Sequence, residues 1–145
     1  MTTPSVALAR RWHMEFFLGD LNLADVIVTP DFLIHGPGLP ADLPRGPQGA
    51  KLYATMLRTG FPDVKLTHDF EVERDDRVVI RWTAKATHTG EFIGIAPTGK
   101  AATITGIDIF RIEGGKLAEL WQEWDQLGML RQLGVIPTPG QAAAA

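Results

Sequence analysis

The second half of the chain alternates apolar and polar residues with the period of two that is typical of β-strands. The alternation runs through residues 64–73 and, after a short turn, through residues 78–88. Two further alternating segments, residues 102–112 and 116–124, are separated by Glu113-Gly-Gly115, a hairpin turn signal. The pattern predicts four long strands with one half-buried face, joined by short connections.

The first half instead spaces its apolar residues three and four positions apart, which indicates amphipathic helices. Helices are predicted over residues 5–18, 22–28 and 49–59, a short strand over residues 31–35 and a last helical segment over residues 126–133. Helices followed by antiparallel strands favour an α+β fold, in which a strongly bent sheet wraps the helices and leaves a cavity at its open end. We expect one domain over residues 1–139 and a disordered tail over residues 140–145.

The amino-acid composition limits the classes of partner that such a domain is expected to bind. The 145 residues are 45% hydrophobic and 21% charged, an ordinary globular balance. A net charge of −3 gives no reason to expect nucleic acid or an anionic membrane as a partner. No apolar run is long enough to cross a bilayer, and the N-terminus lacks the layout of a signal peptide, so we expect a cytoplasmic protein.

Missing residue types narrow the chemistry. The chain has no cysteine, its only serine is Ser5, and no glycine-rich phosphate loop is present. No His-x-His or Glu-x-x-His spacing indicates a metal site, so no metal is expected. Carboxylate, imidazole and aromatic side chains remain as candidates.

Asp108 is a polar residue on an apolar strand face. It shares its parity with Ile104, Gly106 and Phe110, which predicts an inward side chain. Poor solvation of an inward carboxylate favours its protonated form and suits it to proton transfer near neutral pH. The alternatives are a salt bridge or hydrogen bond to a helix, or an outward position at a bulge.

Asp125 follows the last strand and allows two interpretations. It is well placed to cap the helix at residues 126–133, and spacing alone favours that role. The alternative is a carboxylate at the cavity rim, near Trp121 and Trp124.

Two histidines are further candidates. His88 shares the inward parity of its strand, and His35 ends the short strand before a Gly/Pro loop. Either could donate a hydrogen bond to a developing oxyanion or shuttle a proton, or could simply be hydrogen-bonded in the core. His68 has the same ambiguity with weaker context, and His13 is expected to be a helix-face residue.

Large side chains could line a pocket that recognises an aromatic ligand, although many such residues are ordinary core. The candidates are Trp12, Phe16, Tyr53, Met56, Trp82, Trp121 and Trp124.

Several short stretches together resemble the SnoaL-like polyketide cyclase, or ester cyclase, branch of the NTF2-like superfamily. They are Asp31-Phe-Leu-Ile-His-Gly-Pro-Gly38, Phe61-Pro-Asp63, Thr87-His-Thr-Gly-Glu-Phe92 with Pro97-Thr-Gly-Lys100, Gly106-Ile-Asp-Ile-Phe-Arg111, Gly115-Lys116 and Trp124-Asp-Gln-Leu-Gly-Met-Leu-Arg-Gln-Leu-Gly134. They cover nearly the whole chain in the expected order. The resemblance implies a cone-shaped barrel, with N-terminal helices packed on a strongly curved, mostly antiparallel sheet. It also implies homodimers or homotetramers formed through the open sheet face.

The resemblance also implies a chemistry. Family members with known activity close a ring of a polyketide-like ester or ketone by intramolecular aldol condensation, without a metal or organic cofactor. The resemblance places the acid–base aspartate on Asp125, against the preference from spacing, and the assisting histidines on His35 and His88. The strand position of Asp108 varies in the family. Alternatives on the same scaffold are an isomerase, an epoxide hydrolase, or a non-catalytic domain that binds a small hydrophobic or aromatic ligand.

Overall fold

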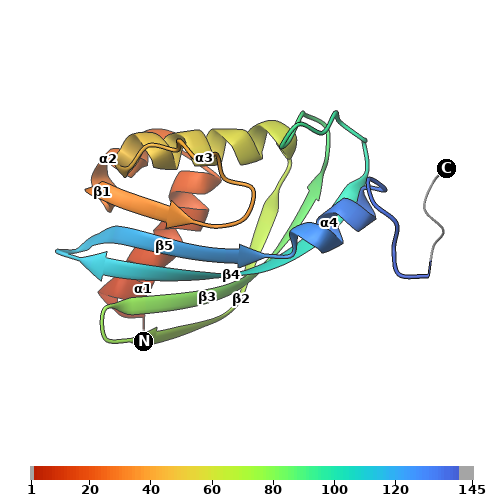
Figure 1. Cartoon of the computed structure of the whole chain (residues 1–145). Coiled ribbons are helices and arrows are strands. Elements are labelled where there is room, and N and C mark those ends of the chain that lie inside the picture. The colour runs from red at the N-terminus through yellow and green to blue at the C-terminus, as the bar shows by residue number, and fades with distance from the viewer. Residues whose placement is uncertain (1, 141–145) are drawn as a thin grey trace.

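The sheet has five strands. The computed structural model describes residues 2–140, so the predicted tail lies outside the described residues except for Gly140. The strands are β1 (Val28–His35), β2 (Lys65–Arg74), β3 (Arg77–Thr87), β4 (Ala101–Glu113) and β5 (Lys116–Trp124). Their order in the sheet is β1-β5-β4-β3-β2. Only β1 and β5 are parallel, and the other neighbours are antiparallel (Figure 1). The predicted four long strands and the short fifth strand are therefore confirmed.

Helices cover one face of this sheet and close one end of it. They are α1 (Pro4–Arg11), α2 (Ala24–Ile27), α3 (Gly46–Gly60) and α4 (Gln126–Gln132). The first helix continues as a π-helical segment, η1 (Trp12–Phe17), and a 3₁₀ turn, η2 (Leu21–Leu23), precedes α2. Figure 1 shows α1 and α3 on one side of the curved sheet and α4 at the end of β5. The helix predicted over residues 22–28 is thus a 3₁₀ turn and one α turn, and it ends where β1 begins.

The strand alternation places the core where it was predicted on β3 and β4. The even-numbered side chains of β3 from Val78 to Ala86 are buried, as are those of β4 from Ala102 to Phe110. Because β3 and β4 pair without a register shift, one parity faces the helices along both strands.

On β2 the alternation is misleading. A register shift between His68 and Phe70 turns the later residues of the strand over. As a result Phe70 and Val72 are 56% and 53% exposed on the outer face of the sheet. The expectation that they share the inward face of Leu66 and His68 is wrong, because a bulge is not visible in a pattern of apolar residues.

Among the described residues, no helix has the length and apolar character that a membrane span requires.

Candidate active site

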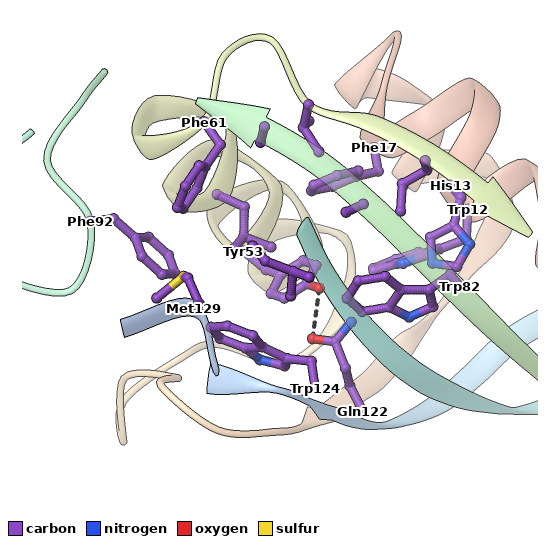
Figure 2. A pocket seen from close by; sticks show the side chains of 16 residues that line it. Trp12, His13, Phe17, Tyr53, Phe61, Trp82, Phe92, Gln122, Trp124 and Met129 are labelled. Atoms are coloured by element: carbon purple, nitrogen blue, oxygen red, sulfur yellow. Dashed lines mark hydrogen bonds between the residues drawn. The ribbon is translucent and has the colours of Figure 1, made fainter. Parts of the chain in front are cut away.

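An aromatic pocket lies between the inner face of the sheet and the helices. Its walls include Trp12 from η1, Tyr53 from α3, Trp82 from β3 and Trp124 from β5 (Figure 2). The cavity measures about 70 Å³. An apolar cavity of roughly 150 Å³ engineered into another protein is large enough for benzene. The cavity between the sheet and the helices is about half that size.

Four of the seven predicted pocket residues line this cavity, namely Trp12, Tyr53, Trp82 and Trp124. The other three do not. Phe16 is fully buried behind Trp12, with 4.7 Å between ring centroids, and Met56 packs against the core from the side. Trp121 lies on the outer face, where it stacks on His35.

The width of the pocket depends on a glycine. Gly106 pairs with Trp82 on one side and with Trp124 on the other, so the two indoles flank it across β4. A Cβ atom at Gly106 would lie 2.3 Å from Cζ2 of Trp82. Any other residue would therefore displace the Trp82 ring from its place on the pocket wall.

Behind the pocket wall lies the carboxylate of Asp108, which is fully buried on β4. Its Oδ2 is 2.7 Å from Nε2 of His13, and its Oδ1 accepts a hydrogen bond of 3.0 Å from Nε2 of Gln122. Both of these partners line the pocket, although Asp108 itself does not. The predicted inward orientation of Asp108 is confirmed, and two hydrogen-bonded side chains connect it to the cavity.

The hydrogen-bond network continues in both directions from Asp108. Tyr53 donates its hydroxyl proton to Oε1 of Gln122 over 2.8 Å (Figure 2). Nδ1 of His13 is 2.8 Å from Nε2 of His68. Burial, and then the nearby charge of Asp108, raise the pKa of the Tyr53 hydroxyl well above its ordinary value, so Tyr53 remains a hydrogen-bond donor at neutral pH.

The tautomer of His13 follows from its partners. Where Asp108 is ionised it can only accept, and Nε2 of His13 then carries the proton of the bond between them. In that arrangement Nδ1 of a neutral His13 is an acceptor, and Nε2 of His68 donates to it.

Two members of this network were not recognised as site residues from the sequence. His13 was predicted to lie on a helix face, but its side chain is only 4% exposed. It lies in the π-helical segment η1, on the buried face that also carries Ala9 and Phe16, and such segments are frequent at functional sites. Gln122 was not considered, although it lies on the same strand face as Leu120 and the alternation that indicated Asp108 indicates it as well.

Comparison with known proteins gives this geometry a context. The family model described as SnoaL-like polyketide cyclase matches residues 7–133. The chain belongs to the SnoaL-like family. The aklanonic acid methyl ester cyclase DnrD of Streptomyces peucetius is 30% identical over 115 residues, which cover 77% of this chain and 75% of that protein.

Solved structures agree with the family assignment. TsrD from Streptomyces laurentii superimposes with a TM-score of 0.80 at 29% identity, over 94% of this chain and 99% of that chain. An NTF2-like protein from Burkholderia pseudomallei superimposes with a TM-score of 0.71 at 21% identity, over 91% and 98% of the two chains. The predicted α+β, NTF2-like fold of this SnoaL-like protein is confirmed.

The aspartate that the resemblance selected lies elsewhere. In this SnoaL-like protein Asp125 is exposed and is the N-cap of α4, where its Oδ1 accepts a 2.8 Å hydrogen bond from the backbone N–H of Gly128. The capping role that spacing alone favoured is present in the structure. Asp125 does not line the pocket, whereas Trp124 directly before it does.

The two predicted histidines are also separate from the pocket. His35 lies on the outer face, with its Nε2 2.6 Å from Oε2 of Glu119. His88 is fully buried and accepts at Nδ1 from the backbone N–H of Thr98, and its ring packs 5.3 Å from that of Phe61 on the pocket wall. Of the four predicted catalytic residues, the structure brings only Asp108 into a network with pocket-lining side chains.

Within residues 2–140, no group of three histidine or acidic side chains is arranged to hold a metal ion.

Proposed function

We propose that this chain is a cofactor-independent cyclase that closes a ring in a polyketide-type ester or ketone by intramolecular aldol condensation. Its SnoaL-like family and a relative named as a methyl ester cyclase support this function. The observation that carries the proposal is the fully buried Asp108 carboxylate, held by two side chains that line an aromatic pocket.

In the first step, Nδ1 of His13 takes a proton from the carbon next to a substrate carbonyl, and the hydrogen bond that Nδ1 accepts from His68 is broken. The C–H bond breaks, its electrons form an enolate, and the proton stays on His13 as an imidazolium that Asp108 stabilises through the 2.7 Å contact. Because the carboxylate is buried, its attraction for the imidazolium is weakly screened by water.

In the second step, the enolate carbon attacks a second carbonyl carbon of the same molecule. A C–C bond forms, the carbonyl electrons move to its oxygen, and the resulting alkoxide takes one proton. Gln122 has a second amide N–H that Asp108 does not use, and the hydroxyl of Tyr53 donates to Oε1 of the same amide and orients it. We assign the second N–H of Gln122 to binding a substrate oxygen, because donors in a dry site stabilise a developing oxyanion strongly.

This assignment differs from the one implied by family resemblance, in which Asp125 is the base and His35 or His88 assists. Burial and contact with pocket residues support Asp108 and His13. The exposed, helix-capping position supports a structural role for Asp125.

The test compares Asp108→Asn with Asp125→Asn, using aklanonic acid methyl ester, the compound in the name of the relative, as substrate. We expect Asp108→Asn to lower turnover by about 10²–10⁴-fold, the usual contribution of a positioned proton-transfer group. Asp125→Asn should leave turnover close to that of the native protein. Circular dichroism of both variants checks the fold.

Three results would contradict the proposal in different ways. Loss of turnover in Asp125→Asn alone would indicate that Asp125 is the catalytic base. Addition of water without ring closure would indicate a hydrolase. Quenching of tryptophan fluorescence by the ester, with no conversion by the native protein, would indicate a binding domain, since Trp12, Trp82 and Trp124 line the pocket.

We further propose that the chain forms a homodimer through the outer face of the sheet. Phe70, Val72 and Ile107 are 56%, 53% and 44% exposed there, which is costly for a monomer in water. Sedimentation equilibrium should give about twice the chain mass of 15.9 kDa, and Phe70→Glu should lower the mass to that of one chain. A native mass of one chain would contradict the dimer.

A further inference from the structure

His68 is the outermost member of the buried network. Along the row Asp108, His13, His68 the burial decreases, because the first two side chains are 0% and 4% exposed and His68 is only partly buried. The successive contacts measure 2.7 and 2.8 Å, and the three residues come from β4, η1 and β2. A continuous row of titratable groups thus leads from the buried carboxylate toward solvent.

We propose that His68 exchanges protons between the buried Asp108–His13 pair and solvent. An imidazole suits this task because it can accept a proton on one nitrogen and release another proton from the second nitrogen. When His13 is an imidazolium, His68 carries its own proton on Nδ1 after exchange with water. The Nδ1–H of His13 then donates to Nε2 of His68, which accepts the proton while Nδ1 of His68 releases one to water. Each transfer moves a single proton, and the reverse sequence returns one to His13.

The surroundings of His68 favour the form that can accept a proton. Burial, and then the proximity of His13, lower the pKa of His68 below its ordinary value, so it is neutral at neutral pH. The charged groups that act on the pKa of His68 include Asp108 on β4, Glu71 on β2 and Arg10 on α1. Arg10 and Glu71 pair with each other through a 2.6 Å contact between Nη2 and Oε1. Because the charges of Arg10 and Glu71 cancel, the protonation of His68 is governed by its contact with His13 and, through it, Asp108.

This inference rests on the proposed function and adds a requirement to it. In an aldol condensation the proton leaves a carbon at one position of the substrate, and the alkoxide that needs a proton forms at another. A single imidazole fixed between Asp108 and His68 cannot reach both positions equally well. Exchange through His68 lets the pair release the first proton and receive the second from solvent.

The experiment measures turnover of aklanonic acid methyl ester by His68→Ala and His68→Gln. The glutamine amide can donate to Nδ1 of His13 but cannot take up and pass on a proton. We expect both variants to lose turnover by on the order of 10²-fold, at an unchanged KM. Free imidazole should restore turnover to His68→Ala, because it can enter the partly exposed space left by the ring. The control is His35→Ala, whose histidine lies on the outer face, and which should show neither the loss nor the rescue.

The outcomes separate this inference from the proposed function. Native turnover in both His68 variants, with turnover still lost in Asp108→Asn, would overturn the role of His68 alone. Native turnover in His68→Gln but not in His68→Ala would show that only the hydrogen bond to His13 matters, and would also overturn it. Failure of the native protein to close a ring would overturn the proposed function, and the role of His68 with it.

Discussion

Two histidine–carboxylate pairs lie on opposite faces of the same sheet. His13 and Asp108 face the pocket with 2.7 Å between Nε2 and Oδ2, and His35 and Glu119 face outward with 2.6 Å between Nε2 and Oε2. The contacts are nearly equal in length, but the side chains are 4% and 0% exposed in the first pair and 43% and 21% in the second. The difference between the pairs is therefore their access to water.

The neighbouring side chains give this difference in access to water a chemical consequence. Glu119 also accepts a hydrogen bond from Nε of Arg111. Its negative charge is therefore shared among the side chains of His35 and Arg111 and water. The hydrogen bond from His35, followed by that from Arg111, lowers the pKa of Glu119 and keeps it ionised. Within residues 2–140, the side chains that hydrogen-bond to Asp108 are His13 and the neutral amide of Gln122. A proton that reaches the inner pair changes the charge of a dry site, whereas the outer pair is buffered by solvent.

The largest expected effect of the difference between the inner and outer pairs is on the free energy of unfolding. Asp108→Ala removes the acceptor of His13 and Gln122 and leaves both polar groups buried without it. We expect a loss of about 3–5 kcal/mol in the free energy of unfolding, the usual cost of breaking a buried pair. Urea denaturation followed by tryptophan fluorescence measures it.

Asp125→Ala is the matched control for that measurement. It removes the cap of α4 and should cost about 0.5–2 kcal/mol. A cost for Asp108→Ala no larger than for Asp125→Ala would mean that water reaches the inner pair, and the two faces of the sheet would then not differ as described.

From the sequence the inner carboxylate was identified, but its main partner was missed. Asp108 was predictable because β4 pairs with β3 without a register shift, so parity alone fixes its direction. His13 was missed although it lies four residues after Ala9 and three before Phe16, a spacing that places it on the same buried face of a helix. His68 lies just before the bulge of β2, and its inward direction could not be separated from that of Phe70 by alternation.

The alternation of side chains along a strand also explains the positions of the two tryptophans near Asp125. Trp121 and Trp124 are three positions apart on one strand, so they must point to opposite faces. Grouping them as two walls of one pocket ignored parity, and the structure places Trp124 on the pocket and Trp121 outside. The family resemblance gave the fold correctly, because a fold depends on many positions, whereas a catalytic role depends on one.

The smallest expected effect concerns the outer pair and completes the contrast. Glu119→Gln removes the charge beside His35 on β1 and Arg111 on β4. Because the folded-state pKa of Glu119 lies below its ordinary value of 4.5, the ionised side chain stabilises the fold above that pH. This contribution is lost as the pH falls through the folded-state pKa. At pH 7 we expect the variant to lose no more than about 1 kcal/mol of unfolding free energy, as for other exposed pairs. Urea denaturation of both proteins between neutral pH and the acid range should show the difference shrinking toward zero below pH 4.5.

A larger loss at neutral pH that diminishes on dilution would show that Glu119 is shielded from water by a second copy of the chain. In that case the outer pair would resemble the inner one only in the assembled dimer.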